Sequence, residues 1–100
     1  MIVVNAKAKT NRENISNLKD VIFSLEQETL KEKGCLDYAF SAEINNPNIM
    51  RITELWEDLQ SLMDHLKTEH VAVFRKEMSK NPIEIKAHFY ESGEIPYPSQ

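Results

Sequence analysis

The segment Asn45-Asn46-Pro47-Asn48 carries a strong turn signal in the middle of the chain, because proline presets φ and asparagine tolerates turn conformations. It separates two stretches, residues 35–44 and 49–56, in which apolar side chains recur at every second position over much of their length. Such alternation predicts strands, and a short turn between two strands predicts an antiparallel hairpin. This central hairpin limits the chain to folds in which an antiparallel sheet is completed by the elements before and after it.

The residues before the hairpin predict a strand and a helix. Residues 2–9 alternate between apolar and other side chains and predict the first strand. Apolar residues then recur at helical spacing over about residues 11–32, which predicts an amphipathic helix. Thr10 and Glu13 have the spacing of a capping box at the start of this helix, and Gly34 is expected to end it.

The residues after the hairpin predict a helical region and a last strand. Asp58 and Thr68 can each cap the start of a helical segment, and the helical pattern continues to about residue 79. Pro82 ends the pattern, and the alternation over residues 83–89 predicts a fourth strand. The order β-α-β-β-α-β predicts an α+β, ferredoxin-like fold with a four-stranded antiparallel sheet.

The composition is typical of a globular chain and argues against several classes of partner. Of the 100 residues, 41% are apolar and only two are glycine, which is enough apolar content for the core of one domain. We expect this domain to span residues 1–91 and an extended tail to follow at residues 92–100. The net charge of -4 and the scattered Lys and Arg residues argue against a nucleic-acid partner. No apolar run approaches the ~18 residues of a membrane span, and no leader-like segment starts the chain, so we expect a cytoplasmic protein without a membrane partner.

Both faces of the third predicted strand carry apolar side chains. Met50, Ile52 and Trp56 share one face, and Ile49 and Leu55 share the other. Helices in this order of elements can cover only one face of the sheet, and a small protein rarely leaves a second apolar face in water. The pattern therefore predicts a homodimer in which the sheets of two subunits pack together.

An acid, an indole and two imidazoles follow one another closely after the turn, as Glu54, Trp56, His65 and His70. Glu54 and Trp56 share one face of their strand because they lie two residues apart. If all four line one cavity, His70 or His65 can act as a general base, Glu54 can orient a histidine, and Trp56 can wall the site. The alternatives are a structural ion pair for Glu54, core packing for Trp56 and a hydrogen-bonded, half-buried ring for His65.

Three further residues are candidates for contact with a substrate. Tyr38 can offer a phenol to the cavity, although packing in the core is the competing interpretation. Asn5 lies among lysines on the first predicted strand, where it can hydrogen-bond a ligand or serve as an ordinary polar strand residue. Phe74 belongs to the apolar positions of the second helical region. Together with Trp56, these residues form the predicted substrate-binding set.

The same region holds the ligand types of a two-histidine, one-carboxylate metal site, with Glu54 as the carboxylate. His65 and His70 would lie about 140° apart round a continuous helix, unless a break at Lys67-Thr68 brings them together. Cys35 is the only cysteine, which excludes a cysteine-rich metal site and an intramolecular disulfide. The sequence has no glycine-rich loop for a phosphate-bearing cofactor. We therefore expect no metal site and no organic cofactor.

Three short motifs stand out as a set: Gly34-Cys35-Leu36-Asp37-Tyr38, Ile52-Thr53-Glu54-Leu55-Trp56-Glu57-Asp58 and His65-Leu66-Lys67-Thr68-Glu69-His70. Together they resemble the antibiotic biosynthesis monooxygenase family of dimeric α+β barrels, and the resemblance extends over about residues 2–90. It implies a ferredoxin-like dimer with one of several activities. These include cofactor-independent oxidation of quinols and polyketide phenols, haem degradation and the processing of autoinducers.

Three positions bear on haem degradation. The resemblance implies that a haem-degrading member has an asparagine on the first strand, a tryptophan on the helix and a histidine ten residues later. Asn5 fits the first position, but His65 and Arg75 stand at the other two, which disfavours this activity. The resemblance then favours a cofactor-independent monooxygenase that uses dioxygen on an electron-rich aromatic such as a quinol or a phenol. A non-catalytic small-molecule binding or stress-response module, and an isomerase acting on a small carbonyl compound, remain alternatives.

Overall fold

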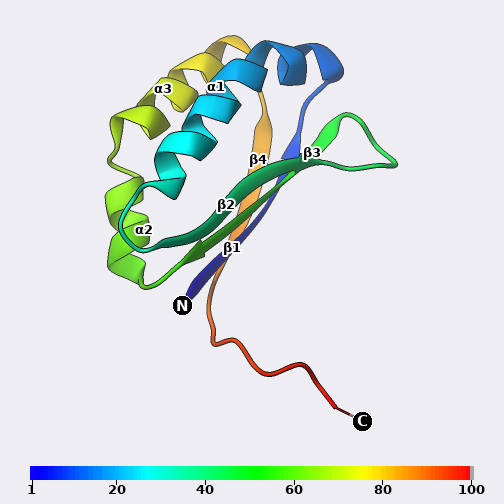
Figure 1. Cartoon of the computed structure of the whole chain (residues 1–100). Coiled ribbons are helices and arrows are strands. Elements are labelled where there is room, and N and C mark those ends of the chain that lie inside the picture. The colour runs from blue at the N-terminus through cyan, green and yellow to red at the C-terminus, as the bar shows by residue number, and fades with distance from the viewer. Residues whose placement is uncertain (100) are drawn as a thin grey trace.

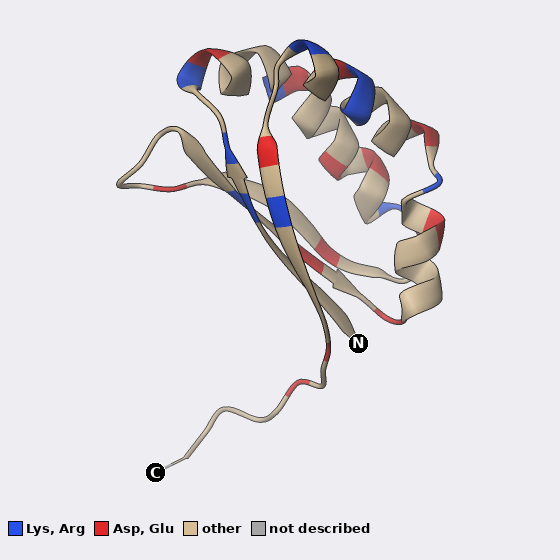
Figure 2. Ribbon diagram, turned by 180° about the vertical axis from the view of Figure 1, so that it is seen from behind, with Lys and Arg blue, Asp and Glu red and all other residues tan. Residues whose placement is uncertain are grey.

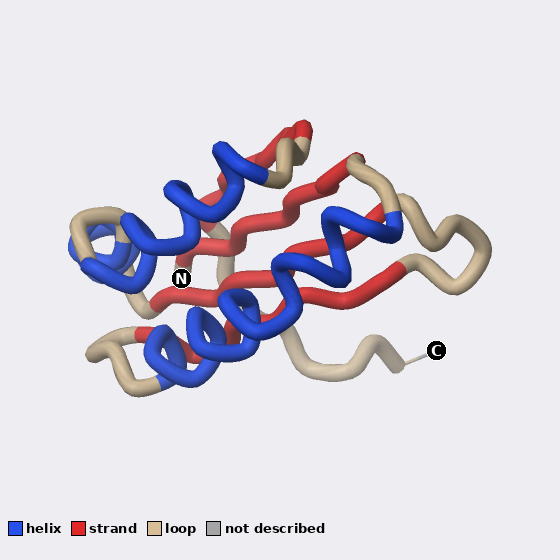
Figure 3. The backbone as a smooth tube through the Cα atoms, turned by 90° about the horizontal axis from the view of Figure 1, so that it is seen from above, coloured by secondary structure: helices blue, strands red, loops and turns tan. Residues whose placement is uncertain are grey.

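Four strands form one antiparallel sheet in the order β2-β3-β1-β4, and the helices lie across one face of it (Figure 1 and Figure 3). The computed structural model describes residues 1–99. The elements follow the chain as β1 (Ile2–Lys9), α1 (Arg12–Leu30), β2 (Cys35–Ala42), β3 (Ile49–Trp56), α2 (Leu59–His65), α3 (Glu69–Lys80) and β4 (Glu84–Glu91). The predicted ferredoxin-like α+β fold is confirmed, with the helical region after the hairpin divided into two helices.

Two details of the element ends differ from the prediction. Helix α1 is capped by Asn11, whose side chain accepts a hydrogen bond from a backbone N–H of the first turn at 2.8 Å. Thr10 is not the cap, because its hydroxyl donates instead to the carbonyl of Pro82 at 2.8 Å. Strand β2 ends at Ala42, and Ile44, which was predicted to continue the strand, is exposed in the turn that follows.

The register of the sheet brings two rows of side chains under the helices. The first row runs across all four strands as Tyr38, Glu54, Val4 and Phe89. The second row, two residues away from the first on each strand, is Phe40, Ile52, Ala6 and Ala87. Residues two apart on a strand point to the same side, so both rows face the helices and form the floor of the space beneath them.

The helices bury unequal shares of the core against this face. Helix α1 buries four side chains, whereas α2 and α3 bury two each. Trp56 at the end of β3 is the largest fully buried side chain. A fully buried Leu such as Leu18 contributes roughly 1.5–3 kcal/mol, so α1 supplies much of the attachment between the helical layer and the sheet.

The opposite face of the sheet carries no helix among residues 1–99. At one end, an apolar cross-strand row is formed by Leu55, Val3 and Tyr90. Toward the other end, a basic row is formed by Arg51, Lys7 and Lys86. The apolar second face expected from the sequence is therefore confined to one end of the sheet. Ile49, near the basic row, is the exception. The homodimer stays a prediction.

We expect the wild-type chain to be a dimer at micromolar concentration and the Val3→Asp variant to be a monomer. A charge between Leu55 and Tyr90 would be buried without a partner in a sheet-to-sheet interface, which costs several kcal/mol. Analytical ultracentrifugation measures the association, and circular dichroism checks that the variant is folded. Met63→Asp on the exposed side of α2 is the matched control. A monomeric wild-type chain would contradict the prediction.

Residues 92–99 follow β4 without helix or strand and run away from the sheet (Figure 1 and Figure 2). The Ser92 N–H donates to the Met1 carbonyl at 2.9 Å, and the apolar side chains of Ile95 and Tyr97 beyond it are exposed. Gln100, the last residue of the predicted tail, lies outside the described residues. Figure 2 shows acidic and basic residues on helices and on strands. Within the described part of the chain, the helices are too short or too polar to cross a membrane.

Candidate functional site

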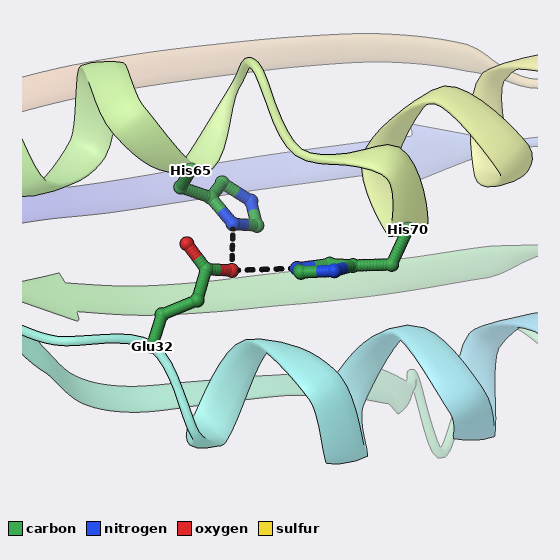
Figure 4. A group of neighbouring side chains, drawn as sticks. All are labelled: Glu32, His65 and His70. Carbon is green, nitrogen blue, oxygen red and sulfur yellow. Dashed lines mark hydrogen bonds and ion pairs between the residues drawn. The ribbon is translucent and has the colours of Figure 1, made fainter.

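A carboxylate and two imidazoles from three separate segments meet at one point (Figure 4). Oε2 of Glu32 lies 2.7 Å from Nδ1 of His65 and 2.6 Å from Nε2 of His70. Glu32 belongs to the turn after α1, His65 ends α2, and His70 lies in the first turn of α3. The side chains of Glu32, His65 and His70 are 15%, 3% and 20% exposed, respectively. The cluster is therefore largely shielded from water.

The break between α2 and α3 lets both histidines reach the same oxygen. Helix α2 ends at His65, and the Thr68 hydroxyl donates to the His65 carbonyl at 2.7 Å instead of capping α3. The chain then turns and restarts as a helix at Glu69. On a continuous helix the two rings would be about 140° apart. The helix break at Lys67-Thr68, which was an alternative in the sequence interpretation, is present and brings the histidines together.

The turn after α1 fixes the position of Glu32. This turn leads to Gly34, whose φ of 83° is a left-handed conformation that glycine adopts without strain. Any side chain at Gly34 would collide with the hydroxyl of Ser61 on α2. The Gly34 carbonyl also accepts a hydrogen bond from the Glu57 N–H at 2.8 Å. Close packing at Gly34 thereby holds the turn that carries Glu32 against the start of α2.

The hydrogen bonds to Glu32 decide which ring nitrogens remain free. An ionised carboxylate can only accept, so Nδ1 of His65 and Nε2 of His70 both donate to it. In the neutral rings, Nε2 of His65 and Nδ1 of His70 then carry the lone pairs that can take up a proton. Within residues 1–99, the ring of His65 hydrogen-bonds through Nδ1 only, which leaves Nε2 without a partner among these residues.

Aromatic side chains hold the His65 ring in place. Its centroid lies 4.8 Å from that of Trp56 and 5.3 Å from that of Tyr38, with both pairs tilted. Contacts of this kind add to the effect of burial. His65 is therefore fixed on one side by the Glu32 carboxylate and on two others by aromatic rings, which is the preorganisation expected of a functional imidazole.

His65 also lines a cavity of about 280 Å³ between the sheet and the helices. Its floor consists of the two cross-strand rows described above, and its roof comes mainly from α2 and α3, including Phe74. Exposed lining residues, among them Leu66, Arg75 and Phe89, mark its opening. Most of the lining is apolar, so the few polar and titratable groups in it stand out as the candidates for chemistry.

Glu54 is the buried acid of this cavity. Its Oε1 accepts a hydrogen bond from Nε1 of Trp56 at 3.0 Å, which confirms that the two side chains share a face of β3. Burial raises the pKa of the Glu54 carboxyl, and the hydrogen bond from Trp56 and the charge of His65 oppose this shift. We expected Glu54 to orient a histidine, but it does not hydrogen-bond either His65 or His70. Glu32 hydrogen-bonds both of them instead.

Burial affects two other acidic groups near the site. It raises the pKa of the Tyr38 phenol, and the nearby carboxylates of Glu54 and Glu32 raise it further. Tyr38 therefore keeps its proton at neutral pH and can act as a hydrogen-bond donor. Partial burial, with Glu32 and Glu54 adding to it, raises the pKa of the Cys35 thiol to about 11. The thiol form dominates at neutral pH, so Cys35 is a poor nucleophile.

We expect Glu54→Gln to stabilise the protein increasingly as the pH rises. Between the ordinary value of 4.5 and its raised pKa, Glu54 holds a proton in the folded state that the unfolded chain has released. Stability is therefore lost as the pH rises through this range, and glutamine, which stays neutral, avoids the loss. Melting temperatures of wild type and variant from pH 4 to pH 8 measure the effect, with the exposed Glu57→Gln as control. A constant difference between wild type and Glu54→Gln over this range would contradict the prediction.

The structure brings four of the expected site residues to the cavity, namely Glu54, His65, Tyr38 and Phe74. Their roles in catalysis and binding stay predictions. The lining now gives these roles a common location, because all four side chains border the same space.

The other three expected residues lie elsewhere, so the expectation of one shared cavity needs correction. Trp56 has no exposed surface and packs beneath His65, where it cannot touch a ligand in this conformation. His70 lines a separate hollow of about 290 Å³ between α1 and α3. Asn5 points to the opposite face of the sheet, in a row with Thr53 and His88, because strand parity places it one residue out of step with the floor of the cavity.

Glu32 was not among the residues predicted from the sequence. It lies 33 residues before His65 and 38 before His70, and neither helical nor strand periodicity links it to them. The one local signal is its place between the end of a predicted helix and Gly34, where the chain must turn. A carboxylate in such a turn is ordinary, so only the three-dimensional fold identifies its partners.

These features define a class of protein: a small α+β fold that encloses a cavity, with a carboxylate-held histidine in its wall, between a four-stranded sheet and its helices. The family model described as antibiotic biosynthesis monooxygenase matches residues 1–77. The chain therefore belongs to the antibiotic biosynthesis monooxygenase family.

Solved structures with the same fold include proteins from bacteria and an archaeon. A candidate antibiotic biosynthesis monooxygenase from Deinococcus radiodurans is 25% identical, with a TM-score of 0.89 over 100% of both chains. A conserved protein from Methanosarcina mazei Go1 is 32% identical, with a TM-score of 0.83 over 92% of both chains. A protein of unknown function from Bacteroides thetaiotaomicron, described as a possible oxidoreductase, is 25% identical, with a TM-score of 0.83 over 91% of this chain and 96% of that one. No curated protein matches the chain.

Proposed function

We propose that the protein is a cofactor-independent monooxygenase that oxidises an electron-rich aromatic molecule, such as a quinol or a phenol, with dioxygen. The observation that carries the proposal is the position of His65, which Glu32 holds at the wall of a largely apolar cavity while its Nε2 stays free. Family membership supports the same class of reaction. The proposal includes a cytoplasmic homodimer that uses no flavin or haem.

The lining of the cavity suits a compact aromatic ring. Tyr38, Phe40 and Phe74 form a chain of rings with centroids 6.0 Å and 5.6 Å apart, and such rings pack well against a planar ligand. The volume of about 280 Å³ is close to the lower limit of small-molecule pockets, which is about 300 Å³. It therefore favours a substrate of one or two fused rings.

His65 is the candidate base in this reaction. Its Nε2 would take a proton from a phenolic or enolic hydroxyl, and the Glu32 carboxylate would stabilise the imidazolium that results. The substrate anion would then transfer an electron to dioxygen, and recombination of the two radicals would form a carbon–oxygen bond. Exclusion of water by the apolar walls protects these reactive species.

The second half of the reaction needs an acid, and Glu54 is suited to this role. The carbon that carries the peroxide loses its hydrogen to a base while the O–O bond breaks, and the departing oxygen takes a proton and leaves as water. One oxygen atom stays on the substrate as a carbonyl. Dioxygen receives all four electrons from the substrate, so no external reductant is required. Because burial raises the pKa of the Glu54 carboxyl, this group holds a proton more readily than an exposed acid.

An isomerase acting on a small carbonyl compound is a second candidate, favoured by the same pair of groups. Moving a hydrogen between neighbouring carbons requires one group that removes a proton and another that returns it. His65 and Glu54 both line the cavity and could act in this way without dioxygen.

A non-catalytic binding module is a third candidate. A second hollow of about 570 Å³ lies between α1 and β2, with Phe23, Phe40 and Met50 among its lining residues. It contains no histidine, so a ligand there would be bound but not deprotonated by one.

The test compares turnover of a panel of one-ring and two-ring quinols with and without dioxygen, using protein treated with a chelator. The monooxygenase predicts product formation with one dioxygen consumed per product and none in its absence. Turnover of a carbonyl compound that is insensitive to oxygen would instead support the isomerase. Binding without any turnover would support the binding module.

A further inference from the structure

The geometry points to a divalent transition-metal site formed by Glu32, His65 and His70. The three ligand atoms, one carboxylate oxygen and two imidazole nitrogens, all lie within 4.8 Å of one another. Two imidazoles and one carboxylate are the donor set that zinc and ferrous iron share in many proteins. From the sequence we expected no metal, because Glu54 was the candidate carboxylate and the two histidines would lie about 140° apart unless the helix broke at Lys67-Thr68. Glu32 and the break before α3 remove both objections.

Small movements convert the hydrogen-bonded cluster into a coordination site. The nitrogens are 2.7 Å and 2.6 Å from the Glu32 oxygen. Ligand atoms about 2.0–2.2 Å from a zinc ion stand roughly 3.0–3.5 Å apart, so each nitrogen needs to move away from the oxygen by less than about 1 Å. The two nitrogens, which lie within 4.8 Å of each other, also have to approach this spacing. The partly exposed side chain of His70 can supply this movement, while the aromatic rings around His65 keep that ligand in position.

The charge of the cluster favours a cation. Among residues 1–99, Glu32 forms ion pairs only with the two histidines, and no Lys or Arg neutralises it. A largely buried carboxylate needs a positive partner, which a bound cation provides. The hollow on the His70 side is also lined by Glu28 and Glu69. Glu28 is paired with Lys31 at 3.3 Å, so Glu69 supplies the negative charge beside His70 that is not already paired with a Lys or Arg.

Metal binding would change which ring nitrogen of His65 carries the proton. When the cation replaces the proton on Nδ1, that proton moves to Nε2, and the ring becomes a hydrogen-bond donor toward the cavity. A metal-bound His65 can then no longer remove a proton from a substrate. Inhibition of turnover by the metal follows from this step, and this part of the inference depends on the proposed function.

The test measures zinc binding to chelator-treated protein by isothermal titration calorimetry, with Zn²⁺ alone as the ligand. We expect one ion per chain with micromolar or tighter affinity. Glu32→Gln and His70→Ala should each weaken binding by about 100-fold or more, since even residues that only support a ligand account for 10–100-fold. His88→Ala is the matched control, because it removes the remaining histidine from the far face of the sheet, and its affinity should equal that of wild type.

The visible absorption spectrum of the Co²⁺-loaded protein provides an independent measurement. Strong bands indicate four or five ligands around the cobalt ion. We expect these bands in wild type and their loss in Glu32→Gln. Absence of stoichiometric zinc binding to wild type would overturn the inference. Folded Glu32→Gln and His70→Ala variants that bind zinc as tightly as wild type would also overturn it. The outcome does not depend on turnover, which is measured on metal-free protein. Stoichiometric zinc binding without any turnover would therefore refute the proposed function and leave the metal site standing.

Discussion

His65→Asn should lower the rate of quinol oxidation by about 10²–10⁴-fold, the range that a lost general base produces. The asparagine amide can take the place of Nδ1 and still donate to Glu32, so the cluster keeps its hydrogen bond while the basic nitrogen disappears. Initial rates of dioxygen uptake by metal-free protein measure the effect. His88→Ala, on the opposite face of the sheet, should leave the rate unchanged.

The pH dependence separates loss of the base from a general disturbance of the site. A phenolic substrate ionises by itself near pH 10, so the variant should recover part of the lost rate as the pH rises toward this value. A damaged cavity would remain slow at every pH. His70→Asn should reduce the rate less than His65→Asn, because His70 does not line the cavity. Equal rates for wild type and His65→Asn would rule out His65 as the base.

The fold was predictable because its signals are local. The turn at residues 45–48 and the alternation on either side predicted the hairpin, and Gly34 marked the turn after α1 at the residue where φ is positive. Each of these features acts over a few residues, so a sequence pattern captures it. Asn11 rather than Thr10 caps α1 because of a non-local contact: the Thr10 hydroxyl donates to the carbonyl of Pro82, 72 residues away.

The sequence placed site residues most directly where strand parity determines which face they occupy. Glu54 and Trp56 were correctly placed on one face, and that face is the one under the helices. The same rule, applied to Asn5, would have excluded it from the cavity, because it lies out of step with the buried positions of β1. The partner of the histidines depends on how the end of α1 packs beside α2 and α3, and no periodicity encodes that contact. Tertiary packing therefore makes Glu32, and not Glu54, the hydrogen-bond partner of the two histidines.

Trp56→Phe should lower the free energy of unfolding by about 2–4 kcal/mol, through the space that the smaller ring leaves and the lost hydrogen bond to Glu54. This is a large share of the roughly 5–15 kcal/mol that stabilises a typical domain. Urea unfolding measures it as a lower midpoint at constant slope, and the exposed Tyr97→Phe serves as control.

The double variant with Glu54→Gln isolates the hydrogen-bond contribution to the Trp56→Phe effect. Removing the indole N–H should also raise the pKa of the Glu54 carboxyl further, because that hydrogen bond lowers it in the wild type. The loss of stability caused by Trp56→Phe should therefore be greater at pH 8 than at pH 5 when Glu54 is present and independent of pH when it is glutamine. Turnover should fall far less than in His65→Asn, since Trp56 supports His65 from beneath without reaching the cavity. An unchanged urea midpoint combined with weaker substrate binding would instead show that Trp56 contacts the substrate directly.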